Sequence, residues 1–229
     1  MEKKDKTNVI YIGNFSGPSG YAVAARGYFK ILSNHSEINL RVLNNSWGAY
    51  GEEPTHLDKY LIKEESEVPL DYVLFYHVEP SEEHLTGIKK FLGIDARKIV
   101  KNAKKTISLT AWEAYGVPSG WKAFFDSYID EIITFCEFQN ENISAHIDKP
   151  VHTIPHLITL PSQPKETISN KFRMLSMSQW SYRKGFDILI QAFLCEFFND
   201  EDVELTIKTF GANGTLKEKE TIIKEIQGY

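Results

Sequence analysis

The stretch SQWSYRKGFDILIQAF, residues 178–193, places two cations, Arg183 and Lys184, directly before Gly185. A short apolar run at residues 172–178 precedes the cations and a helical pattern follows them, so they lie where a strand turns into a helix. The start of a helix already carries partial positive charge, so adjacent cations gain nothing there by themselves. Arg grips phosphate with two hydrogen bonds, and Lys acts as a point charge. The pair therefore predicts an anion-binding site, and the alternative is a pair of solvated surface cations.

A glycine-rich turn, GNFSGPSG at residues 13–20, is a second place where an anion could bind. It follows a strand pattern at residues 8–13 and precedes a helix that we expect from Tyr21 to Leu32. Its glycines let the backbone approach a ligand closely, and the helix N-terminus favours negative charge. The spacing differs from the GxGxxG dinucleotide fingerprint, and Pro18 interrupts it. The alternative is a loop that needs only positive φ angles, and these residues alone leave the two interpretations even.

Polar side chains also follow two strands that read as buried. Trp112 and Glu113 come directly after the run at residues 104–110, and His77 closes the run at residues 71–78. In open parallel sheets, ligands bind outside the carboxyl ends of the strands, which is where a functional Glu113 would stand. The alternatives are a surface Glu beside a core Trp, and a structural His satisfied by a backbone carbonyl. Taken alone, the residues favour these alternatives.

The strand and helix patterns alternate along residues 1–160, which indicates crossover units, an α/β fold and a parallel sheet. Two prolines and two serines with no apolar period follow at residues 161–171, which we interpret as a linker. Residues 172–229 hold only two strands and two helices, too little for an independent open sheet. We therefore expect a complete first domain and an incomplete second one. The second should expose apolar surface around Phe193, Phe197 and Ile207.

The composition excludes several classes of protein. The chain has 26 Lys and Arg against 31 Asp and Glu, a net charge of −5, and no long basic run, which argues against nucleic acid as a partner. Its two cysteines, Cys136 and Cys195, are far apart and form no CxxC, which fits a reducing compartment and predicts a cytoplasmic protein. No apolar window is long enough to span a membrane, and the N-terminus does not resemble a signal peptide. Peripheral membrane contact stays open, although no strongly basic amphipathic helix supports it.

Taken together, the motifs resemble those of one enzyme family. Their order is a glycine-rich loop after the first strand, a Trp-Glu pair at residues 112–113, a Glu-Asn pair at residues 141–142, PVHTIPH at residues 150–156, and the stretch at residues 178–193. In this combination the chain is similar to the retaining GT-B glycosyltransferases of the large group called family 4. The closest subset reads Gln-Trp-x-x-Arg-Lys-Gly-x-Asp. The resemblance extends from Val9 to the C-terminus, and each motif is weak by itself.

The resemblance implies two Rossmann-like domains that face a cleft. The first would bind mostly the acceptor, and the second would bind a nucleotide-diphosphate sugar. The implied activity is that of a hexosyltransferase, which transfers the sugar with retention at the anomeric carbon. Gly17, Ser19, Gly20, Arg183 and Lys184 would grip the donor phosphates, on which charge builds as the glycosidic bond breaks. Such enzymes need no metal and no other cofactor, and the sequence lacks an obvious Asp-x-Asp metal motif.

The chain also departs from the family pattern. Gln179 stands where many relatives have their first phosphate-binding arginine, so Arg183 takes over its charge or donor binding is weaker. Trp112 and Glu113 stand where many relatives have a histidine beside the reacting sugar, which makes Glu113 the candidate catalytic group. His77, Trp112 and Gln179 are further candidates for lining the site. The family's Glu-x7-Glu segment would lie beyond Tyr229, which leaves open whether this chain is active alone.

Two functions other than a transferase are alternatives for this sequence. The first is a non-catalytic or partner-dependent binding module, which would keep an acceptor site and lack part of the donor site. The second is a nicotinamide dehydrogenase, which is disfavoured because the glycine spacing is wrong and no acidic ribose-binding residue follows at the expected distance. The sequence leaves open the sugar, the nucleotide base and the oligomeric state. The acceptor could be a glycan, a lipid-linked saccharide or a protein.

Overall fold

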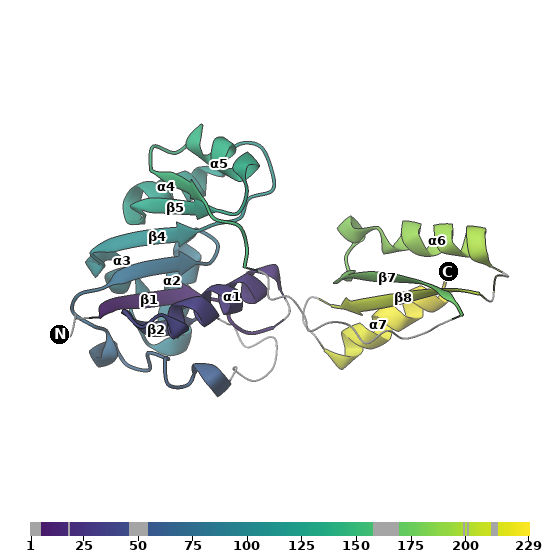
Figure 1. Cartoon of the computed structure of the whole chain (residues 1–229), viewed down its shortest axis with the longest axis horizontal. Coiled ribbons are helices and arrows are strands. Elements are labelled where there is room, and N and C mark those ends of the chain that lie inside the picture. Colours follow the sequence, from purple (N-terminus) through teal and green to yellow (C-terminus); the bar gives the residue numbers. More distant parts are fainter. Residues whose placement is uncertain are drawn as a thin grey trace. The chain divides into compact units, whose positions relative to one another are not determined.

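The computed structural model of the chain describes residues 6–17, 19–45, 55–157, 170–198, 200, 202–211 and 215–229. The chain divides into two compact units, Met1–Thr159 and Leu160–Tyr229, and each is described by itself (Figure 1). Of the linker expected at residues 161–171, residues 161–169 lie outside the described residues.

The first unit is built on a six-stranded sheet in which every pair of neighbouring strands is parallel. The strands are β1 (Thr7–Gly13), β2 (Ile38–Asn44), β3 (Val73–His77), β4 (Lys105–Leu109), β5 (Glu131–Thr134) and β6 (Val151–Thr153). Their order is β2-β1-β3-β4-β5-β6, so the direction of winding reverses between β1 and β3. The predicted α/β fold with a parallel sheet is confirmed. In such a sheet, the crevice at the carboxyl ends of β1 and β3 is the expected place for a ligand.

Five α-helices connect these strands (Figure 1). They are α1 (Gly20–Asn34), α2 (Glu82–Leu92), α3 (Ala96–Asn102), α4 (Ser119–Tyr128) and α5 (Glu137–Ser144). Short 3-10 turns lie at Thr55–Leu57 and Glu65–Glu67. The sequence indicated α1 and α4 but not α2, α3 or α5. In α5 the reason is visible, because two of its three buried residues, Gln139 and Asn142, are polar and hide the apolar period.

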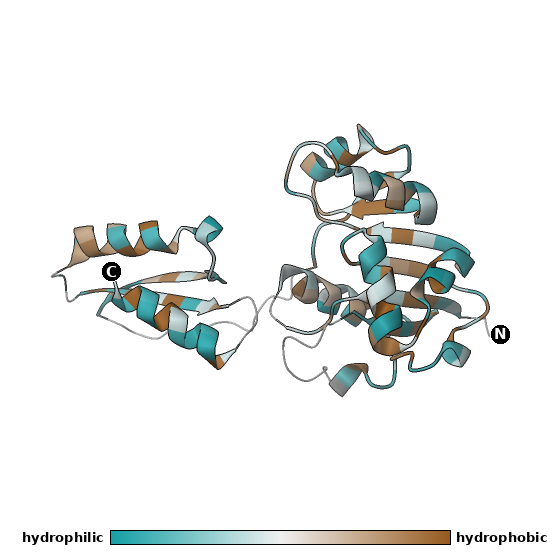
Figure 2. Ribbon diagram, turned by 180° about the vertical axis from the view of Figure 1, so that it is seen from behind, coloured by the Kyte–Doolittle hydropathy of each residue, from teal (hydrophilic) through white to brown (hydrophobic). Residues whose placement is uncertain are grey.

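The sheet is buried on both faces, which explains the near-continuous apolar runs of its central strands. Alternate residues of β1 point to opposite sides. Ile10 and Ile12 belong to the core that contains side chains of α2, α3, α4 and α5. Val9 and Tyr11 belong to a second core with Phe29 of α1. Hydrophobic residues accordingly colour much of these strands in Figure 2.

The second unit has two parallel strands, β7 (Phe172–Gln179) and β8 (Val203–Phe210). Two helices, α6 (Phe186–Phe197) and α7 (Leu216–Gln227), and a 3-10 turn at Tyr182–Lys184 complete its described elements. Met174 and Leu205 face each other across the strand pair and, with residues of α6, line an apolar cavity of about 590 Å³.

The opposite face of this two-stranded sheet is open to solvent. Leu175 and Met177, which alternate with Met174 along β7, are each 67% exposed. The unit therefore exposes apolar surface, as predicted, but at other residues than those predicted. The expected residues, Phe193, Phe197 and Ile207, are half-buried. The strongly exposed apolar residues of this unit include Phe172, Leu175, Met177, Ile188 and Phe198.

Two further findings bear on the class of protein. No helix within the described ranges is both long enough and apolar enough to cross a membrane. The two cysteines are exposed free thiols, with Cys136 directly before α5 and Cys195 within α6.

Replacing Leu175 and Met177 together by threonine should reduce binding of a hydrophobic dye and self-association. Both side chains are 67% exposed, so their removal should change the free energy of unfolding by no more than about 0.5 kcal/mol each. Dye fluorescence and sedimentation velocity measure the first effect, and urea unfolding measures the second. The control is Met174→Thr on the helix-covered face, which should destabilise the unit. Dye binding that equals that of the wild type would contradict the assignment of the open face.

Candidate functional site

The turn between β1 and α1 combines a left-handed glycine with a capped helix start. Gly17 has φ 80°, a left-handed backbone that favours glycine. Ser19 is the N-cap of α1, and its hydroxyl accepts a hydrogen bond from the Ala22 amide at 3.2 Å. Within the described residues, no acceptor is recorded for the amides of Gly20 and Tyr21. These two donors stand at the positive end of the helix macrodipole.

Arg26 of α1 holds this turn from the helix side. One of its terminal nitrogens, Nη1, donates to the carbonyl oxygens of Phe15 and Gly17, each at 2.9 Å. The Asn44 side chain of β2 accepts from the Phe15 amide at 3.1 Å. Burial lowers the pKa of Arg26, but a guanidinium stays charged at neutral pH. The sequence analysis missed Arg26, because a single arginine inside a helix carries no motif.

His77 lies at the carboxyl end of β3, beside the point where the winding reverses. Its Nδ1 lies 2.7 Å from the Tyr11 hydroxyl of β1, and its Nε2 is buried with no hydrogen-bond partner among the described residues. Its partner is thus a tyrosine rather than the backbone carbonyl that we considered. Burial, and secondly the nearby His156, lower the pKa of His77 to about 3, so the ring is neutral at physiological pH.

Aromatic rings surround His77 and exclude water from it. The ring centroids of Tyr11, Tyr28 and Phe135 lie 6.0 Å from that of the histidine, and that of Tyr21 lies at 5.4 Å. The histidine is only 1% exposed. The histidine therefore lies behind these rings, which separate it from solvent.

Tyr21 joins the glycine-rich turn to the ends of two other strands. Burial raises its pKa, a hydrogen bond from the Ala111 backbone lowers it, and the charges of Glu79 and Glu113 raise it further. The Ala111 backbone is a hydrogen-bond partner of Tyr21, and the His77 ring lies 5.4 Å from the Tyr21 ring, so Tyr21 of α1 lies beside the end of β3 and the loop after β4. The structure thus gathers the turn and Glu113 at the carboxyl edge of one sheet. The sequence analysis did not single out Tyr21.

The loop that carries Glu113 is fixed by Asn142 of α5. The Asn142 Oδ1 accepts from the Gly116 amide at 2.9 Å, and its Nδ2 donates to the carbonyls of Ala114 and Gly116 at 3.2 and 3.0 Å. The Trp112 indole also donates to the Gly116 carbonyl, at 2.8 Å. Trp112 is half-buried, whereas Glu113 is exposed. The loop therefore has a fixed base and presents Glu113 on its outer part.

In the second unit, Arg183 and Lys184 lie in the 3-10 turn at Tyr182–Lys184, and both are exposed. Gly185 follows with φ 64°, a conformation that an L side chain rarely adopts, and α6 begins directly after it. Trp180 stacks on Phe186 with ring centroids 4.5 Å apart. This aromatic pair anchors both ends of the turn, so the two cations are displayed on a defined piece of backbone.

Gln179 is the last residue of β7 and pairs in register with Phe210 of β8. It is half-buried and lies at the carboxyl end of β7. Glu113 has a similar position, shortly after the carboxyl end of β4. The glycine-rich turn and the Arg183-Lys184 pair belong to different units, so each is a separate candidate site. Among the described residues, no group of three or more His, Cys, Asp or Glu is placed to hold a metal ion.

Comparison with known proteins adds little to this picture. No protein-family model matches the sequence, and no curated protein matches it. One of the solved structures that it resembles is a chain in a crystal structure of a GtfA/B complex, with a TM-score of 0.39 and 15% sequence identity. The match covers 69% of this chain and 32% of that chain, so this chain spans about a third of its length. A likeness of this size carries no argument about activity.

Replacing Asn142 by alanine should destabilise the first unit by about 1–3 kcal/mol, because the half-buried Gly116 amide and the Ala114 carbonyl lose their partner, while the Gly116 carbonyl keeps its bond from Trp112. Urea unfolding measures the change. The matched control is Asn102→Ala, at an exposed position near the end of α3, which should stay within about 0.5 kcal/mol of the wild type. Equal stability of the two variants would show that Asn142 does not hold the loop.

His77 should make the protein less stable in acid. Its pKa is about 3 when folded and about 6.5 when unfolded, so the unfolded chain binds the additional proton between these values. The free energy of unfolding should fall as the pH drops from about 6.5 towards 3, by up to about 1.4 kcal/mol per pH unit. His77→Gln should flatten this slope, and the exposed His35→Gln should leave it unchanged. Identical slopes in unfolding curves recorded across this range would refute the assignment.

Proposed function

We propose that this chain is part of a retaining GT-B glycosyltransferase that transfers a hexose from a nucleotide-diphosphate sugar to an acceptor. The observation that carries the proposal is the gathering of the glycine-rich turn and the Glu113 loop beside Tyr21, at the carboxyl edge of one parallel sheet. A helix-start loop next to a carboxylate would suit transfer of a glycosyl group from a diphosphate, because the loop could bind the phosphates and the carboxylate could face the sugar. The order of sequence motifs supports membership of family 4, and the two free thiols agree with a cytoplasmic location.

The donor phosphates would be held by two strand-to-helix junctions. In the first unit, Gly17 and Ser19 shape the turn, the amides of Gly20 and Tyr21 point from the start of α1, and Arg26 adds a nearby positive charge. Hydrogen-bond donors at a helix N-terminus are a common way of binding phosphate. Backbone and guanidinium donors of this kind cost no reorganisation when charge develops on the leaving group.

In the second unit, Arg183 and Lys184 would neutralise the diphosphate as the glycosidic bond breaks. Their exposure and the left-handed Gly185 leave the turn accessible to a ligand. With cations in this place, the reaction would need no metal ion and no further cofactor, because the nucleotide-sugar is a substrate. Gln179, at the end of β7, would lie on the same side of this unit and contact the donor through its amide.

Glu113 would lie beside the transferred sugar. Its position on the outer part of a loop with a fixed base suits a group that must reach a ligand from a rigid support. A carboxylate there would accept hydrogen bonds from sugar hydroxyls and stabilise the positive charge that develops at the anomeric carbon. Trp112, held by its own indole hydrogen bond, would form a wall of the same site.

A second candidate function is a binding module that needs a partner chain for catalysis. The observation in its favour is the open face of the β7–β8 sheet, where Leu175 and Met177 are each 67% exposed. Such a module would keep the first unit's site and receive the rest of its donor site from the partner. Turnover by a single purified chain separates the two functions.

The double variant Arg183→Ala with Lys184→Ala, made in the natural full-length protein, should lower turnover by at least about a hundredfold. The estimate assumes two charge-assisted contacts worth about 1.5 kcal/mol each. Sugar transfer is measured with the nucleotide-sugar that the wild type uses, and binding of the matching nucleoside diphosphate by calorimetry.

The matched control for this experiment is Arg173→Ala with Lys208→Ala, which removes the same charge from the exposed face of the β7–β8 sheet. This control should keep both turnover and diphosphate binding. Unchanged turnover in the Arg183 and Lys184 variant would exclude these residues from the phosphate site.

A further inference from the structure

A groove lies on the first unit between the start of α2 and one side of α4. Its volume is about 680 Å³, which is the size of a small-ligand site. Trp112 belongs both to the wall of this groove and to the loop that carries Glu113, so the groove opens beside the proposed site of sugar transfer. None of the steps proposed above uses it.

Aromatic rings form one wall of the groove. The rings of Trp112 and Trp121 lie 5.0 Å apart at an angle of 58°, and Trp112 is fixed by its hydrogen bond to Gly116. Trp121 is only 6% exposed and packs into the core, so the open ring surface comes mainly from Trp112 and from Tyr128, which lines the groove at the other end of α4. Rigid aromatic surfaces bind flat apolar faces at a small cost in conformational entropy, and the C–H face of a sugar ring is such a surface.

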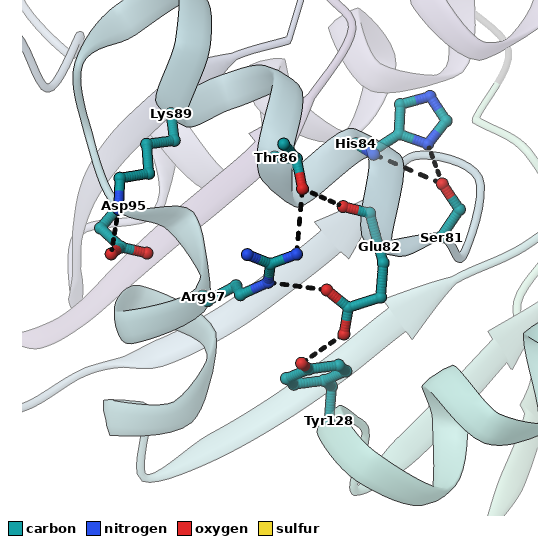
Figure 3. Close-up of polar contacts among 8 residues, drawn as sticks. All are labelled: Ser81, Glu82, His84, Thr86, Lys89, Asp95, Arg97 and Tyr128. Carbon is teal, nitrogen blue, oxygen red and sulfur yellow. Dashed lines mark hydrogen bonds and ion pairs between the residues drawn. The ribbon is translucent and has the colours of Figure 1, made fainter.

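Carboxylates face these rings from the loop after β3 and the first turn of α2. Glu82 is held in place by Arg97, whose Nε donates to it at 2.7 Å, and by the Tyr128 hydroxyl (Figure 3). Arg97 also donates to the Thr86 hydroxyl at 3.0 Å. Hydrogen bonds from Tyr128 first and then from Arg97 lower the pKa of Glu82, so both contacts favour the charged form of this carboxylate.

The charge in the groove excludes one class of ligand. Glu79 and Glu83 also line it, both are exposed, and within the described ranges neither has a recorded ion-pair partner. The lining residues that the structure describes include no Lys and no Arg. The lining residues contact two cations, Arg97, already bound to Glu82, and Lys101, whose Nζ lies 5.7 Å from the centre of the Tyr128 ring. Phosphate, pyrophosphate and uronic acid groups would meet like charge here.

We propose that this groove is the acceptor subsite and that it binds a saccharide without acidic groups, in preference to a lipid-linked pyrophosphate. That the bound saccharide is the acceptor rests on the function proposed above. That the groove binds a saccharide does not depend on that function. The aromatic wall takes the apolar face of a sugar ring. The opposite carboxylates accept hydrogen bonds from its hydroxyls, and three carboxylates against one bound guanidinium favour a neutral or amino-bearing ring.

The four tryptophans of the chain give a direct readout of binding. In the ¹⁵N-labelled full chain, cellobiose and chitobiose should shift the indole N–H resonances of Trp112 and Trp121. The resonance of Trp180, in the other unit, should not move. Trp112→Phe and Trp180→Phe variants assign these signals. Digalacturonate and inorganic pyrophosphate should leave the Trp112 and Trp121 signals in place.

Reversing one charge tests the reason for this selectivity. Glu83→Lys should let digalacturonate shift the Trp112 and Trp121 signals, with a gain in affinity of up to about fivefold from one exposed charge pair. Asp58→Lys, at an exposed position elsewhere on the same unit, makes the same change in net charge and should have no such effect. Absence of a Trp112 and Trp121 shift with both neutral disaccharides would overturn the proposal. Equal shifts with digalacturonate or pyrophosphate in the wild type would overturn it as well.

Binding of nucleoside diphosphates, measured on the same sample, keeps this inference separate from the proposed function. If the neutral sugars shift the Trp112 and Trp121 resonances and no nucleoside diphosphate binds, saccharide binding by the groove is supported and the transferase proposal fails. If a nucleoside diphosphate binds and the sugars cause no shift, the groove proposal fails and the transferase proposal stands.

Discussion

The hydrogen bond between the Tyr11 hydroxyl and His77 Nδ1 joins β1 and β3 where the winding of the sheet reverses. The Tyr11 hydroxyl and His77 Nδ1 are buried and satisfy each other, and the rings of Tyr21, Tyr28 and Phe135 exclude water around them. The bond ties β1 and β3 together near their carboxyl ends, which are Gly13 and His77. Because the glycine-rich turn and the loop after β3 leave from these residues, their starting points are fixed as well.

Above this base, single side chains determine the shape of the loops. Arg26 satisfies two carbonyls of the turn after β1, and Asn142 satisfies two carbonyls and one amide of the loop after β4. Each of these two residues comes from a helix and supplies hydrogen bonds that a loop backbone cannot make for itself. The rigid sheet and two well-placed polar side chains are therefore sufficient to hold the loops at its carboxyl edge.

The strands were predictable from the sequence because buried parallel strands are nearly continuous apolar runs, and β8 spans the residues expected for it. Helices with polar or short buried faces, such as α5, left no such pattern. The positions of Gly17, Glu113 and Arg183 on loops and turns were likewise predictable from local signals. The roles of Tyr21 and Arg26 were not, because their contacts join segments that only the folded chain brings together.

In the β4–α4 loop, some residues hold the backbone in place and others face solvent. Trp112, Gly116 and the partner Asn142 carry the hydrogen bonds, while Tyr115 is 88% exposed and Glu113 is exposed as well. Changes at the two outer positions would alter what the loop touches and leave its backbone in place. Natural variation at these positions, or directed evolution of them, can therefore change the outer surface of the loop at little cost in stability, whereas variation at the base would cost stability first.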